Sequence, residues 1–164
     1  MHDAVGGYIR EQVAKHGPFK RVLEIGSLDI NGTIRPLFSG AETYVGIDVQ
    51  NGPGVDVVAD GATYESDIKF DCVVSTEALE HCDHADALIA NAHRLLGKGG
   101  VFLMTCAGVG RPPHSGIDEH PIREWEFYRN VDEVMLTEWL NDAGFGARDI
   151  NIEGSDIRCW AVKP

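Results

Sequence analysis

Residues 21–26 read Arg-Val-Leu-Glu-Ile-Gly, a short and mostly apolar run that includes one acid and breaks at a glycine. Such a run, bounded by a turn residue, is typical of a buried strand. Comparable runs follow at residues 43–48, 55–61, 70–75 and 100–106. Repetition of this pattern predicts a sheet whose strands are covered on both faces.

Helical patterns accompany these strands. Apolar residues at helical spacing mark three helices, namely Val5, Tyr8, Ile9 and Val13, then Leu88, Ala92, Leu95 and Leu96, and finally Val131, Met135, Leu136, Trp139 and Leu140. We expect Asp83 and Gly97 to cap the second helix, and Asn130 and Gly144 to cap the third. Strands that alternate with helices indicate parallel βαβ units.

The last two expected strands differ from the others. They span residues 145–152 and 157–162, and only residues 153–155 separate them. A connection this short cannot cross over a sheet, so the pair must be antiparallel. We therefore predict an α/β fold, a Rossmann-like three-layer αβα sandwich of about seven strands, mostly parallel, with an antiparallel last strand.

Length and charge limit the function. The 164 residues fit a single domain, 1–164, and the formal net charge is −12. This charge argues against a nucleic-acid partner and against an anionic membrane surface. No apolar stretch is long enough to span a membrane, and the N-terminus lacks a signal-peptide pattern. The cysteines have no short paired spacing, so we expect reduced thiols and a cytoplasmic location.

Acidic residues lie where the predicted strands end. Glu24, Asp48, Asp60 and Glu77 lie at or near four successive carboxyl ends, which is where open parallel sheets bind ligands. Acids repel a pyrophosphate but suit a ligand with an ammonium group, ribose hydroxyls and an adenine amine. That description fits S-adenosylmethionine.

The glycine pattern agrees with this choice. A dinucleotide site favours the pattern G-x-G-x-x-G after the first strand. Here Gly26 is followed by Ser27 and Leu28, so the second glycine is missing. A nicotinamide-dependent oxidoreductase is therefore the weaker interpretation.

Taken in order, these motifs resemble the class I S-adenosylmethionine-dependent methyltransferases. The resemblance runs from about Val22 to Cys106 and is carried by residues 22–26, 46–48, 59–61, 70–75 and 96–100. It implies cofactor contacts at Glu24, Gly26, Ser27, Asp48, Val49, Asp60, Gly61, Ser75 and Thr76. Leu28 departs from the usual glycine, which leaves the backbone contacts of that loop open.

A polar run follows the fourth strand. On a helix, Glu77, Glu80 and His81 would share one face at the mouth of that strand. They could simply favour the start of a helix, or His81 could act as a general base for the acceptor. We take His81, His114 and His120 as the catalytic candidates.

The same run could also hold a divalent metal. Glu-x-x-Glu-His is similar to runs in the ubiquinone-biosynthesis O-methyltransferases and in the small-RNA 2′-O-methyltransferases. In the latter, a further histidine completes the metal site. The resemblance makes Glu77, Glu80, His81 and His120 metal-ligand candidates, with His114 as an alternative to His120.

Residues 107–129, called the lid segment below, are too long for a plain connection. They concentrate cationic and aromatic side chains, namely Arg111, His114, His120, Arg123, Trp125, Tyr128 and Arg129. We expect a substrate lid that recognises an anionic or aromatic group. The alternative is a packed surface loop with Trp125 and Phe127 in the core.

These observations predict an enzyme that transfers a methyl group from S-adenosylmethionine to a small-molecule acceptor, at oxygen or nitrogen. A metal-assisted O-methyltransferase and a non-catalytic S-adenosylmethionine-binding module are the alternatives. The chain leaves little room for an acceptor domain, so a second copy or a partner subunit could complete the acceptor pocket.

Overall fold

The computed structural model describes residues 3–118 and 120–164. The elements follow in the order α1 (Asp3–His16), β1 (Arg21–Ile25), η1 (Arg35–Phe38), β2 (Thr43–Asp48), β3 (Val57–Val58), β4 (Phe70–Thr76), η2 (Leu79–His81), α2 (Ala85–Leu95), β5 (Leu96–Ala107), α3 (Glu133–Ala143), β6 (Arg148–Glu153) and β7 (Asp156–Val162). The described residues include no helix both long and apolar enough to cross a bilayer.

The strands form one sheet in the order β3-β2-β1-β4-β5-β7-β6. Strands β1 to β5 run parallel, and β7 lies antiparallel between β5 and β6. The predicted seven strands and inserted antiparallel strand are confirmed. Strand order reverses between β1 and β4, so a ligand is expected beyond their carboxyl ends.

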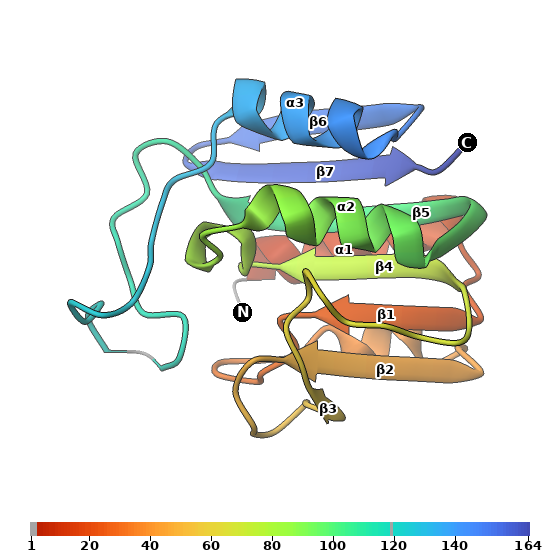
Figure 1. Ribbon diagram of the computed structural model, residues 1–164, viewed down its shortest axis with the longest axis horizontal. Helices are drawn as coiled ribbons and strands as arrows, with labels where there is room; N and C mark the ends of the chain where they lie inside the picture. The colour runs from red at the N-terminus through yellow and green to blue at the C-terminus, as the bar shows by residue number, and fades with distance from the viewer. Residues whose placement is uncertain (1–2, 119) are drawn as a thin grey trace.

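Helices cover both faces of the sheet (Figure 1). Helices α2 and α3 pack on one face around residues such as Leu23, Ile89 and Phe102. Helices α1 and η1 cover the other face, where Ile9 and Phe38 pack against the sheet. Because β1 lies between β2 and β4 and is covered on both faces, its residues from Val22 to Ile25 are buried, and Glu24 is the one polar residue among them.

The third strand is shorter than predicted. Of residues 55–61, only Val57 and Val58 pair, with Ile47 and Asp48. Both valines are exposed at the edge of the sheet, so burial does not extend the strand. The fifth strand is longer than predicted at both ends, since it begins at Leu96, which pairs with Phe70 of β4, and continues to Ala107, which pairs with Asp156 of β7.

The caps of α2 were predicted wrongly. His84 occupies the N-cap position, and its side chain makes no capping bond. The Asp83 carboxylate contacts the His84 ring instead. The helix ends at Leu95 and the chain continues directly into β5 at Leu96, so Gly97 lies inside a strand.

Helix α3 begins later than predicted. Asp132 is its N-cap, and the Asp132 side chain accepts from the Met135 backbone N–H at 2.8 Å. Asn130 instead donates to the Arg111 carbonyl. The predicted stop is confirmed, because Gly144 adopts a left-handed conformation with φ of 90°.

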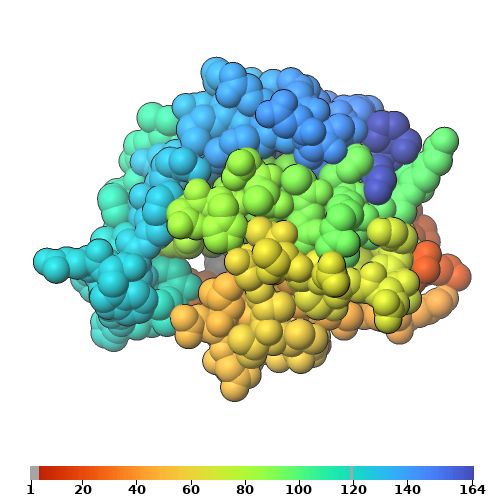
Figure 2. Space-filling model, in the orientation of Figure 1, coloured from red at the N-terminus to blue at the C-terminus, as the bar shows by residue number. Residues whose placement is uncertain are grey.

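The lid segment projects beyond the carboxyl ends of the parallel strands (Figure 1) and forms a lobe of the surface in Figure 2. Arg111 ties it to Asp156 of β7 by an ion pair. The alternative that placed Trp125 and Phe127 in the core is wrong, since they are 69% and 38% exposed.

Candidate functional site

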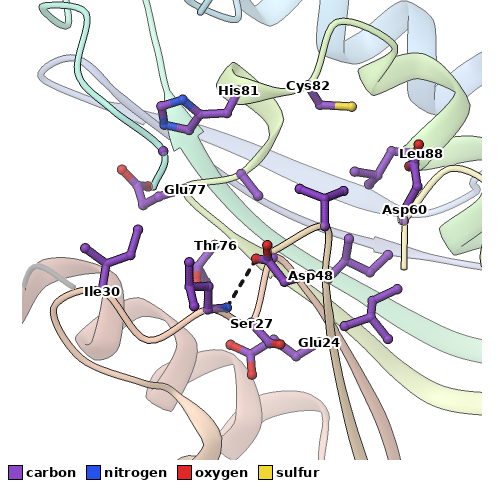
Figure 3. Close-up of a pocket in the computed structure, with 18 of the residues that line it drawn as sticks. Glu24, Ser27, Ile30, Asp48, Asp60, Thr76, Glu77, His81, Cys82 and Leu88 are labelled. Carbon is purple, nitrogen blue, oxygen red and sulfur yellow. Dashed lines mark hydrogen bonds between the residues drawn. The ribbon is translucent and has the colours of Figure 1, made fainter. Parts of the chain in front are cut away.

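A cavity of about 250 Å³ lies at the carboxyl ends of β1, β2 and β4 (Figure 3). The predicted cofactor residues that line it are Glu24, Gly26, Ser27, Asp48, Val49, Asp60, Gly61 and Thr76. Ser75 is fully buried and is not among the lining residues. Glu77 and His81 lie toward one end of the cavity, and Asp60 and Leu88 lie toward the other.

The charged residues of the cavity wall are acidic. Among the described lining residues, Glu24, Asp48, Asp60 and Glu77 are carboxylates, and none is Lys or Arg. A pyrophosphate would find no cationic partner there, whereas a cationic ligand with hydroxyl and amine donors fits. The donor set therefore matches S-adenosylmethionine better than a dinucleotide.

Gly26 lets the chain turn tightly after β1. Its φ is 80°, and a Cβ atom there would lie 2.6 Å from the Ala78 side chain. The backbone N–H groups of Gly26 and Ser27 both donate to the Ile47 carbonyl. A glycine is thus required both by conformation and by space.

The Asp48 carboxylate fixes the backbone at Leu28, the position where the usual pattern has its second glycine. The Leu28 backbone N–H donates to Asp48 Oδ2 at 3.2 Å, and the Gln50 N–H donates to Oδ1 at 2.8 Å. The first of these bonds is drawn in Figure 3. A carboxylate offers about four acceptor positions, so each oxygen keeps capacity for a ligand hydroxyl.

Two residues at the far end of the cavity escaped the sequence prediction. Cys82 and His84 line it, and His84 Nε2 lies 3.1 Å from Asp60 Oδ2. Asp60 Oδ1 accepts from the Ala62 backbone N–H. The available signal was the position of Cys82 and His84 shortly after the carboxyl end of β4, where a ligand is expected.

The predicted helix over residues 77–81 is wrong at its start. Glu77 has a φ of 53° and so belongs to a turn, while η2 spans only Leu79–His81. The Glu77 N–H donates to the Thr105 carbonyl, and Thr105 Oγ1 donates to Glu77 Oε1 at 2.8 Å. These bonds hold a strained conformation.

Because of that turn, Glu80 points inward. It is fully buried, and the Ala107 N–H donates to its Oε1 at 3.0 Å. Oε2 has no hydrogen-bond partner among the described residues. Burial, with a smaller effect of Glu77, raises the pKa of Glu80 to about 8.

His81 lies under the lid segment. Its ring is edge-on to the rings of His114 and Tyr128, at centroid distances of 5.0 and 5.5 Å. Burial and then His114 lower the pKa of His81 to about 4, while the negative charge of Glu126 opposes this shift. Nδ1 is buried and has no partner among the described residues. The ring is therefore neutral near pH 7.

A second cavity, of about 440 Å³, adjoins the first beneath the lid segment. His114 and His120 line it. The residues that line both cavities are Ile30, Asn31, Glu77, His81 and Gly116. The three predicted catalytic histidines thus surround one space, although His120 is exposed at its edge.

The cations of the lid segment have partners within the protein. Arg123 pairs with Asp118 and Glu126, and Arg111 pairs with Asp156. These ion pairs give no support to the expectation that the lid segment recognises an anion through Arg111 or Arg123. His114 and Tyr128 remain as its aromatic contacts near His81.

The metal-ligand candidates are only partly brought together. Glu80, His81 and His114 each offer a ligand atom, and these atoms lie within 4.8 Å of one another. Within the described ranges, Glu77 and His120 do not join that group. Sequence spacing could not choose between His114 and His120, because the lid segment has no periodicity.

Comparison with known proteins agrees with the fold. Residues 2–150 match a family described as a methyltransferase domain. No curated protein matches the chain. The fold is similar to the 1,6-didemethyltoxoflavin-N1-methyltransferase of Burkholderia thailandensis, solved with 1,6-didemethyltoxoflavin and S-adenosylhomocysteine (17% identity, TM-score 0.70, covering 98% of this chain and 77% of that one).

Two further structures share the fold. The N-methyltransferase NodS of Bradyrhizobium japonicum, in complex with S-adenosylhomocysteine, is 16% identical with a TM-score of 0.68, covering 99% of this chain and 86% of that one. The N-terminal domain of EvdMO1, with S-adenosylhomocysteine bound, is 18% identical with a TM-score of 0.73, covering 100% and 83%.

The sheet order and the acidic cavity define a class I S-adenosylmethionine-dependent methyltransferase. The chain belongs to the methyltransferase domain family that matches residues 2–150. The resemblance noted from its motifs is confirmed.

Proposed function

We propose that this enzyme transfers the methyl group of S-adenosylmethionine to a nitrogen or oxygen atom of a small molecule held in the second cavity. One observation carries the proposal: Glu77, His81 and Gly116 line both cavities. An acceptor under the lid segment would thus meet the cofactor at this shared wall.

The residues around the first cavity suit the parts of the cofactor. Glu24 would face the ammonium group, Asp48 and Val49 the ribose and the edge of the adenine, and Asp60 with Gly61 the adenine amine. Gly26 and Ser27 would let the backbone approach closely, beside Thr76. The bound cofactor supplies an activated methyl group, so the protein mainly has to align the acceptor and exclude water.

His81 is proposed to orient the acceptor. His81 Nδ1 has no partner among the described residues, and in the neutral tautomer with its proton on Nε2 this atom carries a free lone pair. That atom could accept a hydrogen bond from an O–H or N–H group of the acceptor. Two of the similar structures are N-methyltransferases by name, which favours nitrogen.

Labelled S-adenosylmethionine and a panel of small amines and alcohols test this proposal. We expect label in at least one acceptor, and a loss of turnover of about 10²-fold or more in His81→Gln. His93→Gln on α2 is the control, because His93 does not line the first or the second cavity. Slow decay of the cofactor with no labelled acceptor would instead favour the non-catalytic module.

A metal-assisted reaction is the second candidate. It is favoured by the grouping of Glu80, His81 and His114, and by the unpartnered Glu80 Oε2 and His81 Nδ1. These residues would hold a divalent ion, which would polarise the acceptor oxygen.

Titration with Mn²⁺ distinguishes the two candidates. A metal site predicts binding by the wild type and by His120→Gln, but not by Glu80→Gln, together with loss of activity in a chelator that Mn²⁺ restores. Full activity in the chelator, with no Mn²⁺ binding, would leave His81 acting alone.

A further inference from the structure

Glu24 is held by a side chain outside the motif that contains it. The Glu24 carboxylate is 4% exposed and lines the cofactor cavity. The Tyr44 hydroxyl, from the neighbouring strand β2, donates to Glu24 Oε2 at 2.6 Å. This bond uses one acceptor position on Oε2, and a carboxylate offers about four, so Glu24 keeps capacity for a ligand.

The sheet register places the two side chains together. Tyr44 pairs with Val22, and Glu24 pairs with Gly46. Residues two apart on a strand share a face, so the Tyr44 ring lies on the same face as Glu24. Burial, followed by the charge of Glu24, raises the pKa of the Tyr44 hydroxyl. The hydroxyl therefore keeps its proton and remains a donor.

Arg35 holds the Tyr44 ring in place. Its guanidinium lies 4.6 Å from the ring centroid, and it is anchored in turn by the Asp56 carboxylate and the Gly54 carbonyl. Asp56 also accepts from the Gly46 N–H at 2.7 Å. Burial raises the pKa of the Glu24 carboxyl, and the Tyr44 hydrogen bond and then the positive charge of Arg35 oppose that rise.

We infer that Tyr44, held by Arg35, is a positioning residue that fixes the Glu24 carboxylate to receive the ammonium group at the amino-acid end of the cofactor. The inference rests on the proposed cofactor contacts. It assigns to Tyr44 and Arg35 a role in selecting the amino-acid end of the cofactor, separate from the residues that face its nucleoside end.

A pair of ligands tests the inference. S-adenosylhomocysteine carries the ammonium group, and methylthioadenosine has the same nucleoside without the amino acid. By calorimetric titration, Tyr44→Phe should weaken S-adenosylhomocysteine about tenfold and leave methylthioadenosine within about twofold. Phe keeps the ring packing against Phe38. Tyr64→Phe, which does not touch the cavity, is the control and should match the wild type for both ligands.

A double variant excludes a merely structural role. If Tyr44 acts through Glu24, adding Tyr44→Phe to Glu24→Gln should cause no further loss of S-adenosylhomocysteine affinity. Equal weakening of both ligands by Tyr44→Phe, or additive losses in the double variant, would overturn the inference. Wild-type protein that binds neither ligand would refute the cofactor assignment itself, and the inference with it.

Discussion

At the scale of single residues, Glu24 combines a buried position with a functional charge. Burial raises the pKa of its carboxyl to about 7 from an ordinary 4.5, against the hydrogen bond from Tyr44. The folded state therefore holds this proton more tightly than the unfolded chain. The stability that this group contributes is present at low pH and is lost as the pH rises from about 4.5 to about 7.

Glu24→Gln should therefore gain stability relative to the wild type as the pH increases. Gln imitates the protonated acid, so the two proteins should unfold alike near pH 5 and diverge by about pH 8 in favour of the variant. Urea denaturation of the ligand-free proteins measures the difference. The exposed Asp67→Asn should show no such trend, and a Glu24→Gln difference that is constant with pH would contradict the prediction.

The proposed contact between Asp48 and the ribose predicts that a change at Asp48 weakens cofactor binding. Asp48→Asn keeps an acceptor oxygen for one backbone N–H but removes the charge. We expect S-adenosylhomocysteine binding to weaken by about 1.5–3 kcal/mol, as for other hydrogen bonds to charged groups. Titration calorimetry measures this change, with Asp67→Asn again as the control. Unchanged affinity in Asp48→Asn would remove Asp48 from the cofactor site.

At the scale of elements, the lid segment is fastened at its base. The ion pair between Arg111 and Asp156 is partly buried, with both side chains less than one-fifth exposed. The Arg111 carbonyl also accepts from Asn130. Together these contacts connect the start of the lid segment to β7 and to the chain leading into α3.

Arg111→Met should loosen the lid segment while leaving the sheet intact. If the ion pair contributes about 1 kcal/mol, amide hydrogen exchange over residues 109–118 should accelerate about fivefold. Exchange in β4 should not change. The exposed Lys98→Met is the matched control, and equal acceleration throughout the chain would show general destabilisation instead.

Elements also show where sequence reasoning succeeds and where it stops. Strand β1 was predictable because burial on both faces favours a run of mostly apolar residues, here Val22, Leu23 and Ile25 around Glu24. The left-handed turn at Glu77 was not, because in a non-glycine residue such a conformation depends on bonds to Thr105, which is distant in sequence. The carboxylates at the strand ends could be predicted from topology alone. The approach of His114 to His81 could not, because no periodicity orders the lid segment.

At the scale of the whole molecule, the protein is acidic, and the cofactor cavity is acidic as well. The net charge is −12, and the cofactor cavity is lined by carboxylates without a Lys or Arg among its described residues. The net negative charge of the protein repels a phosphate-bearing cofactor at long range, and the carboxylates of the cavity repel it on contact.

Ligand-dependent stability of the intact protein tests this selectivity. At about one hundred times its dissociation constant, S-adenosylhomocysteine should raise the free energy of unfolding by about 2.7 kcal/mol. NAD at the same concentration should produce no shift. Thermal unfolding with each ligand measures both effects, and stabilisation by NAD alone would contradict the cofactor assignment.

The shared wall of the two cavities has a thermodynamic consequence. Glu77, His81 and Gly116 would touch both the cofactor and the acceptor, and a Cβ atom at Gly116 would lie 2.7 Å from the His81 ring. If binding of one ligand shifts these shared residues, the contacts of the other ligand change as well. Linkage then requires reciprocity: the factor by which the cofactor tightens or loosens the acceptor equals the factor by which the acceptor alters the affinity for the cofactor.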